Sequence, residues 1–539
     1  MKTTSRRSFI RTSFFSGLTL FFSRNLVRAK SIINKITDPF KPNYDSLRQY
    51  ECPAWFRDAK FGIFLHYGLN TVPGMNGHYG RFMYLQKKDP QFPHWAEWGK
   101  DVYQYHLDTY GHPSEFGYKD FVPLWKADKF DAEKLGAYFK SIGARYVVPV
   151  AVHSDNFDNW NSKHHRWNAK NMGPKIDFIG EWKKACDKLG LRFGVSEHMS
   201  THIERWFHGT TDLEGPKAGI PYDTVNPDYE DFYVRRDPKN RNKVHAGFRQ
   251  NWYNRMKDLL DSYEPDLFYF DGSFPYKDTG EGINIVTHFY NSNMERNNGK
   301  NEAVMCIKTH GNKEIEGTCV DDIERGQSDK LREIPWQTDT TINQGWFYLG
   351  KTDTVVTKVG EEAAMKGSKD KKLLDGPMVI QNLCDIVSKN GNLLLNVGQR
   401  ADGSIPDLFK KDLDVIGQWL KINGEAIYET RPWKIYGEGP TIVTAGHFKE
   451  PSKPFVAEDI RFTTKGNFLY AMAMGIPKKP VEIKALGKNS KLLGKQIAKI
   501  ELLGNAQKIN WEFTAQALVI DVPKKIKSKH AVAFKITLS

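Results

Sequence analysis

Short apolar runs recur between residues 61 and 396, and a polar side chain follows nearly every one of them. The run from Leu267 to Phe270 is wholly apolar and rich in aromatic residues, as expected of a strand that is buried on both faces. Comparable runs cover 61–65, 145–152, 191–196, 303–307 and 392–396, and a shorter one begins at Val320. The pattern predicts a set of parallel strands in the protein interior.

Amphipathic segments separate these runs. In 132–141, 179–189 and 248–263 the apolar residues recur at helical spacing. Repetition of strand, helix and strand implies parallel strands joined by right-handed crossovers. Because seven or so such units fit a closed barrel better than an open sheet, we predict an α/β fold: a (β/α)8-like (TIM) barrel over residues 30–430, in which the middle strands can be irregular.

The pattern changes after Trp433. Short β-type runs at 441–444, 467–473, 497–503 and 517–522 are separated by Gly, Asn and Lys turns. The segment before them, from Leu413 to Tyr428, has helical spacing and is expected to be the last barrel helix. We therefore predict an antiparallel β-sandwich over residues 431–539.

The N-terminal segment is expected to lie outside the fold. Arg6 and Arg7 precede an apolar run from Phe14 to Phe22, and Ala29 ends a region suited to cleavage. Paired arginines before a modest apolar run are typical of a bacterial twin-arginine export signal. The run is too short to span a bilayer. We expect residues 1–29 to direct export to the periplasm or beyond, and we expect no membrane span.

Composition narrows the classes of partner. The formal net charge of the 539-residue chain is +14, which suits nucleic acid or a sulfated or carboxylated polymer. No recognition helix, zinc-finger spacing or RNP motif supports nucleic acid, so we expect no such partner. The five cysteines are scattered without a CxxC, which argues against a disulfide framework and a structural zinc site.

Polar side chains at the strand ends are the candidates for chemistry. In a parallel α/β barrel the carboxyl ends of the strands form the floor of the active site. A single Asp in this position could equally cap a turn, so the recurrence carries the prediction. The residues that directly follow the predicted strands include His66, His153 with Asp155 close behind, Glu197 and His198, Asp271 and Lys308.

Several motifs resemble glycoside hydrolase family 29, the retaining α-L-fucosidases. The similarity begins at Phe61–Gly68, continues through Ser141–Val148 and His153–Phe157, and is strongest at 390–398, 402–403 and 416–428. It covers roughly residues 45–435. The resemblance implies an imperfect barrel with a C-terminal β-sandwich. It also implies exo-acting double-displacement cleavage of terminal α-L-fucosyl residues from glycans, without a metal or a cofactor.

The same resemblance assigns the nucleophile to Asp271. A carboxylate can attack the anomeric carbon while an acid about 5 Å away protonates the leaving oxygen. We predict Glu324 as this acid/base, and a structural ion pair with a nearby Arg or Lys is the other interpretation of this residue. Asp322 and Glu333 are the reserves. Some relatives have a Glu where this chain has Gln337, but a glutamine cannot cycle a proton.

The strand-end histidines are expected to bind sugar hydroxyls. His66 and His153 match family motifs, and His198 is included because it follows a predicted strand. Each could instead be a core or loop histidine. His78 and Asp155 belong to segments that line the pocket in the family. Trp160 and Trp336 are candidate walls for the apolar face of the sugar, or else ordinary packing.

Three departures from the family pattern concern the sugar pocket. His153 is followed by Ser154 where the family usually has a second His, and the segment Gly77–Tyr84 lacks the usual Glu-Trp before its Tyr. A strand-end Arg of relatives has no clear counterpart near Lys308. A related L-sugar such as L-galactose, or a sulfated glycan, is therefore a candidate substrate beside fucose.

Two other function classes are open from the residues alone. A metal-dependent barrel hydrolase could use the strand-end histidines with Asp155 and Asp271, but such sites normally begin with His-x-His, and Tyr67 follows His66 here. A carbohydrate-binding protein without catalysis would suit a rebuilt pocket, but the retained Asp271 argues against it. A glycosidase without a metal site is the prediction.

Overall fold

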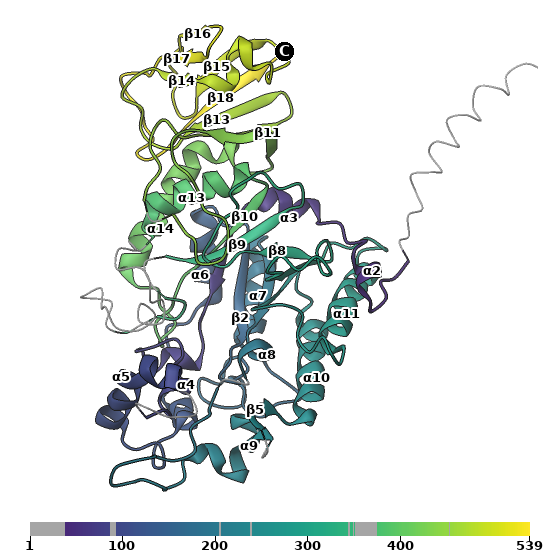
Figure 1. Cartoon of the computed structure of the whole chain (residues 1–539), viewed down its shortest axis with the longest axis vertical. Helices are drawn as coiled ribbons and strands as arrows, with labels where there is room; N and C mark the ends of the chain where they lie inside the picture. Colours follow the sequence, from purple (N-terminus) through teal and green to yellow (C-terminus); the bar gives the residue numbers. More distant parts are fainter. Residues whose placement is uncertain are drawn as a thin grey trace, which may run out of the picture.

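The computed structural model describes residues 38–539 apart from 87–92, 204–205, 235, 238–239, 343–344, 349, 351–373 and 452. The predicted export signal at 1–29 lies outside the described residues. The C-terminal sheets form one end of the molecule, beyond the helices α13 (Gly376–Ser388) and α14 (Asp407–Asn423), as Figure 1 shows.

Eight parallel strands close into a barrel in the ring order β1-β10-β9-β8-β7-β6-β3-β2. β1 pairs with both β2 and β10, which closes the ring. The predicted barrel is confirmed, with a register shift between β2 and β3. The strands are β1 (Phe61–Leu65), β2 (Tyr146–Val152), β3 (Arg192–Glu197), β6 (Leu267–Phe270), β7 (Val304–Ile307), β8 (Val320–Asp322), β9 (Trp336–Thr341) and β10 (Gly391–Asn396).

Helices follow most of the barrel strands, and several begin at an aspartate that caps them. The Asp131 and Asp177 side chains accept the backbone N–H groups of Lys134 and Gly180. No helix in the described part of the chain has the length and apolar character needed to cross a membrane. The other helices are α2 (Tyr44–Leu47), α3 (Ala54–Ala59), α4 (Tyr79–Phe82), α5 (Pro93–Tyr110), α6 (Ala132–Ser141), α7 (Phe178–Leu189), α8 (Met199–His202), α9 (Glu230–Tyr233), α10 (Ala246–Tyr263) and α11 (Glu281–Arg296).

The strand β9 was not predicted, because its sequence is polar. Gln337 donates a hydrogen bond to Asp322 on β8 at 2.9 Å, and the Tyr269 hydroxyl donates to Asp339 at 3.1 Å. Tyr269 lies on β6, which is not adjacent to β9, so this contact crosses the barrel interior. Hydrogen bonding inside the barrel allows a polar strand to be buried.

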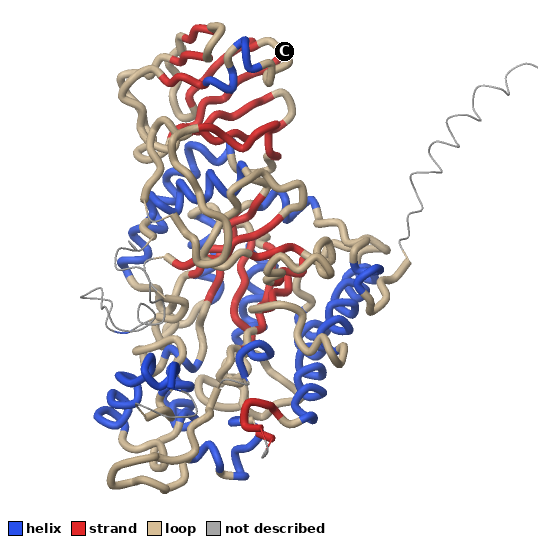
Figure 2. The backbone as a smooth tube through the Cα atoms, in the orientation of Figure 1, coloured by secondary structure: helices blue, strands red, loops and turns tan. Residues whose placement is uncertain are grey.

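The C-terminal region contains two antiparallel sheets, which confirms the predicted fold class. One has the order β11-β12-β13-β18-β15 and the other β14-β17-β16, and apolar side chains of both form a core of their own. Figure 2 shows these strands gathered at the far end of the chain. The strands are β11 (Arg431–Glu438), β12 (Ile460–Lys465), β13 (Phe468–Ala473), β14 (Val481–Ile483), β15 (Ile497–Leu502), β16 (Trp511–Phe513), β17 (Leu518–Ile520) and β18 (Val532–Leu538).

One predicted strand in this region is wrong. Residues 441–444 form no strand; they belong to a long connection between β11 and β12. The runs predicted at 467–473, 497–503 and 517–522 correspond to β13, β15 and β17. The misassigned connection matters for the site, because it returns to the barrel.

The two regions are joined through α13 and α14. The Gln381 side chain exchanges two hydrogen bonds with the Phe455 backbone, each 3.0 Å long. Asp385 on α13 forms an ion pair with Arg461 on β12, with 2.5 Å between Oδ1 and Nε. On α14 the indole of Trp419 donates to the carbonyl of Ala531 at 2.8 Å. Specific polar contacts therefore fix the C-terminal region against the barrel.

Candidate active site

Three charged side chains meet at the carboxyl end of the barrel, and we call them the Lys308 cluster. Asp271 follows β6, Lys308 follows β7 and Glu324 lies in the loop after β8. The Lys308 ammonium contacts Asp271 Oδ1 and lies 2.6 Å from Glu324 Oε2. Because one nitrogen contacts both carboxylates, the two oxygens that face it lie within about 5 Å of each other, the spacing of retaining glycosidases.

The Lys308 cluster is charged and partly open to solvent. The side chain of Lys308 is 6% exposed, and those of Asp271 and Glu324 are each 16% exposed. Burial alone would lower the pKa of Lys308, but the charges of Asp271 and Glu324 outweigh it and raise this pKa well above its ordinary value. The ammonium therefore stays protonated across the physiological range.

A second layer of carboxyl groups lies beneath the cluster, in the barrel interior. Burial raises the pKa of Asp339 to about 6. Burial and the nearby Asp339 also raise the pKa of Asp322 well above its ordinary value. The Tyr269 hydroxyl lies 3.1 Å from Asp339 and 3.3 Å from Asp322. Asp322, a reserve for the acid/base, is thus part of the barrel floor.

Three buried histidines surround the other side of Asp271. The ring of His198 lies 4.9 Å from that of His66 and 4.9 Å from that of His153. His198 Nδ1 is 3.1 Å from Asp271 Oδ2, and His66 Nδ1 is 2.8 Å from the Asn396 side-chain oxygen. Burial is the main cause that lowers the pKa of His66 and His153 well below the ordinary value, and the charge of His198 is the second. These two rings are therefore neutral hydrogen-bonding groups at pH 7.

The same histidines have the proximity required of metal ligands, since one ligand atom from each lies within 4.8 Å of the others. However, both ring nitrogens of His198 are already engaged, Nδ1 with Asp271 and Nε2 with Ser196 Oγ at 3.0 Å. His153 Nδ1 is buried without a hydrogen-bond partner among the described residues. This arrangement suits hydrogen bonding to a polar ligand better than ligation of a metal by all three rings.

Comparison with known proteins identifies the family. The family model described as Alpha-L-fucosidase matches residues 27–425, and the model of the Alpha-L-fucosidase C-terminal domain matches residues 453–537. The chain belongs to the α-L-fucosidase family. The family, the fold and the glycoside hydrolase class expected from the sequence are therefore confirmed.

Curated relatives and solved structures agree with this assignment. The tissue α-L-fucosidase of Homo sapiens is 29% identical over 453 residues, which cover 82% of this chain and 80% of that protein. The tissue α-L-fucosidase of Mus musculus is 27% identical over 514 residues, covering 93% and 94%. The crystal structure of Thermotoga maritima α-fucosidase superposes with a TM-score of 0.65 and 26% identity, covering 92% of this chain and all of that one.

Two further residues expected in this fucosidase site lie at its edge or behind it. His78 is half-buried, and its ring lies 5.4 Å from Trp206, which in turn is 6.0 Å from the ring of His153. Asp155 is 2% exposed and accepts a hydrogen bond from the Tyr118 hydroxyl at 2.9 Å. Burial raises the pKa of Asp155 to about 7. Asp155 therefore supports the loop after β2 from behind.

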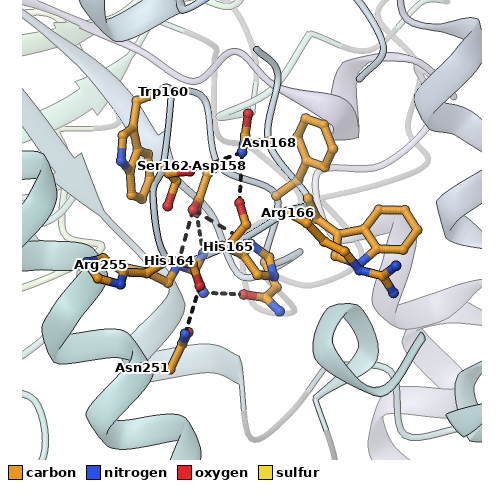
Figure 3. A network of polar contacts seen from close by, with 12 residues as sticks. Asp158, Trp160, Ser162, His164, His165, Arg166, Asn168, Asn251 and Arg255 are labelled. Atoms are coloured by element: carbon orange, nitrogen blue, oxygen red, sulfur yellow. Dashed lines mark hydrogen bonds and ion pairs between the residues drawn. The ribbon is translucent and has the colours of Figure 1, made fainter. Parts of the chain in front are cut away.

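The two tryptophans expected to wall the sugar lie elsewhere in the fucosidase. Trp160 is fully buried beside the ion pair of Asp158 and Arg255, as Figure 3 shows. Trp336 begins β9 and pairs in register with Gly391 at the start of β10, so it lies at the amino end of the barrel. Its indole donates to the Lys389 carbonyl at 2.9 Å. Neither side chain reaches the Lys308 cluster.

Glu333, the other reserve for the acid/base, also lies away from the Lys308 cluster. It is exposed and precedes β9, at the end of the barrel opposite to Asp271. Among the three candidates for the acid/base, Glu324 is the one that contacts the Lys308 ammonium.

The fucosidase has aromatic neighbours that were not predicted. The ring of Trp346 lies 5.0 Å from that of His66, and the ring of Phe347 lies 4.9 Å from that of His153. Both follow β9, so a prediction of this strand would have placed them at the carboxyl end of the barrel. Lys308 was recognised as a strand-end residue but not as a site residue.

Proposed function

We propose that the protein is an exo-acting retaining α-L-fucosidase in which Asp271 is the nucleophile and Glu324 the acid/base. The observation that carries this proposal is the shared contact of both carboxylates with the Lys308 ammonium. It brings the carboxylates to the spacing that double displacement requires, at the end of the barrel where such enzymes act.

In the first step Asp271 attacks the anomeric carbon while Glu324 donates its proton to the leaving oxygen. In the second step Glu324 accepts a proton from water, which displaces Asp271 and releases the sugar with its configuration retained. Glu324 must be protonated at the start, yet contact with an ammonium favours the carboxylate. The sugar must therefore draw Glu324 away from Lys308 as it enters.

Recognition of the sugar falls to neutral groups. His66, His153 and His198 supply donors and acceptors for hydroxyls, and the uncharged state of His66 and His153 suits an uncharged pyranose. Trp346 and Phe347, which pack on these rings, form the apolar wall for the methyl group of fucose. His78 extends the polar lining toward Trp206.

Substitution of the two carboxylates tests the mechanism on an aryl α-L-fucoside. We expect Asp271→Ala to lower kcat by roughly 10³-fold or more, because nothing replaces the nucleophile. We expect Glu324→Ala to turn over slowly and to regain activity with azide, which needs no general base. Glu333→Ala is the matched control and should retain full activity. Azide rescue of Glu333→Ala instead of Glu324→Ala would refute the assignment.

We also propose that the substrate is a fucoside or a closely related L-sugar on an anionic glycan. The altered positions near His153 and Tyr79 and the net charge of +14 support this proposal. A panel of aryl glycosides of fucose, L-galactose and other deoxy sugars tests the glycone. Sulfated and desulfated forms of one fucosylated polysaccharide test the anionic part, and equal rates at low salt would argue against it.

Export is the last part of the proposal. The paired arginines Arg6 and Arg7 before an apolar run support transport through the twin-arginine route. Replacement of both by lysine should keep the full-length chain in the cytoplasm, whereas the unaltered chain should be recovered from the periplasm or the medium after cleavage near Ala29. Equal export of both forms would refute this route.

A further inference from the structure

The connection between β11 and β12 returns to the loop that carries Glu324. The backbone N–H of Phe448 donates to the carbonyl of Glu324 at 2.8 Å, and that of Glu450 donates to Arg325 at 3.1 Å. The N–H of Gly446 completes the pairing on Gln327 at 3.2 Å. Gly446 and Gln327 form an antiparallel bridge, so a segment of the C-terminal region lies directly against the loop 324–327.

This close approach depends on small residues and is reinforced by side chains. A Cβ on Gly326 would lie 1.9 Å from the Gly446 carbonyl oxygen, so glycine is required there. The Glu450 carboxylate lies 3.2 Å from Arg325 Nε and also accepts a hydrogen bond from Thr340 on β9. Glu450 therefore fixes the segment 446–450 both to the loop 324–327 and to β9.

The side chain of His447 also contacts the backbone of Glu324. Its Nδ1 accepts the backbone N–H of Glu324 at 3.0 Å, and its ring lies 4.5 Å from that of His310. Burial lowers the pKa of His447 to about 4, with His310 and Lys308 acting in the same direction and Asp321 against them. The ring is therefore neutral, and because Nδ1 accepts, the proton resides on Nε2.

We propose that His447 is a positioning residue for the acid/base, supplied to the barrel by the C-terminal region. This inference rests on the proposed role of Glu324. Glu324 has to exchange the Lys308 ammonium for the leaving oxygen, and a fixed backbone defines the arc through which its carboxylate moves. Misplacement by about 1 Å far from the reacting atoms can lower a rate by about 10²-fold.

The decisive measurement is how kcat/KM depends on the leaving group. The full-length protein, His447→Ala and His447→Asn are assayed with aryl α-L-fucosides whose phenols range from strongly to weakly acidic. An Asn oxygen can occupy the place of Nδ1 and accept the N–H of Glu324, whereas Ala cannot.

We expect His447→Ala to lose about ten- to a hundredfold in kcat/KM on weakly acidic phenols, because these leaving groups need the proton. It should lose little on strongly acidic phenols, which leave unaided. His447→Asn should recover most of the loss. Lys449→Ala, an exposed change in the same segment, is the control and should behave like the unaltered protein.

A loss of equal size on all phenols, or a loss that Asn does not restore, would overturn the proposal, since either outcome describes a purely structural residue. If His447→Ala does not fold, Glu450→Gln tests the same segment through its contact with Arg325. A selective loss then supports the proposal, and unchanged leaving-group dependence overturns it.

Failure of the underlying function has a different signature. It would appear in Glu324→Ala with His447 intact, as an absence of both azide rescue and leaving-group dependence. If Glu324→Ala behaves as an acid/base variant and His447→Ala shows no selective loss, the positioning role alone is refuted.

Discussion

The Lys308 cluster has a counterpart of opposite charge pattern at the junction of the barrel and the C-terminal region. There Asp385 lies between two cations, 2.6 Å from Lys389 Nζ and 2.5 Å from Arg461 Nε, and we call these three residues the Asp385 cluster. In the Lys308 cluster one cation lies between two anions. Both are ion triads, but they differ in their exposure to solvent.

The Asp385 cluster is closed to solvent. Asp385 and Lys389 are 0% exposed and Arg461 is 2% exposed. The ring of Tyr436 lies 4.7 Å from the Lys389 ammonium and 5.4 Å from the Arg461 guanidinium. The two carboxylates of the Lys308 cluster keep 16% of their side-chain surface exposed. Removal of one member of a closed triad leaves buried charges without a counterion, whereas an open triad can exchange partners with a ligand.

The largest expected effect separates the two clusters by stability. We expect Asp385→Ala to lower the free energy of unfolding by about 3–5 kcal/mol, because two buried cations lose their counterion. Denaturant unfolding of the full chain measures the change. Glu501→Ala, which breaks an exposed pair with Lys499, is the control and should change stability by no more than about 0.5 kcal/mol. Equal effects of both substitutions would remove the distinction.

A smaller effect should fall on catalysis. We expect Lys308→Met to lower kcat/KM by about 10²-fold, because a charge fixed against both carboxylates is lost. The pH profile of kcat/KM should move to higher pH, since no ammonium then favours the ionised carboxylates.

The melting temperature distinguishes this change from the one at Asp385. It should remain within a few degrees of that of the unaltered protein, since Asp271 and Glu324 can reach water or share a proton. Lys308→Arg keeps the charge and should retain most of the activity. A large loss of stability in Lys308→Met with an unshifted pH profile would make this cluster structural as well.

The smallest effect concerns the carboxyl layer beneath Lys308. The folded protein holds the Asp339 proton to about pH 6, whereas the unfolded chain releases it near about pH 4. The stabilisation is therefore fully present below about pH 4 and is lost as the pH rises through about 6. Thermal unfolding from pH 4 to 8 tests this on Asp339→Asn. Over this range the free energy of unfolding of the variant should fall by about 1–2 kcal/mol less than that of the unaltered protein. A curve parallel to that of the unaltered protein would contradict this.

The apolar barrel strands were readable from the sequence, and the polar strand β9 was not. The run that precedes Asp271 has no polar residue, so its burial and its strand end follow directly from composition. β9 escaped prediction because Gln337 and Asp339 find their partners in the folded barrel, on the neighbouring β8 and, across the interior, on β6. Because β9 was missed, Trp336 was predicted to line the pocket. The tryptophan that lies beside His66 is Trp346, ten residues further along the chain.

The two carboxylates of the Lys308 cluster were predicted through family motifs, but the groups that contact them were not. Asp271 and Glu324 were both named, whereas the ammonium that joins them follows β7, the strand between β6 and β8 in the ring, and was not predicted as a site residue. His447 lies 123 residues from Glu324, three residues after a run that the pattern assigned to a strand. Contacts between segments so far apart depend on the folded path of the connection, which local periodicity does not specify.

The contact of segment 446–450 with the loop 324–327 also affects how the two regions of the protein can evolve. A descendant that exchanged its C-terminal region for another would keep all eight barrel strands and Asp271. It would lose the imidazole and the carboxylate that hold the loop 324–327. On the proposed roles of Glu324 and His447, selection for hydrolysis acts on both regions together, and recombination at their junction separates parts of a single catalytic unit.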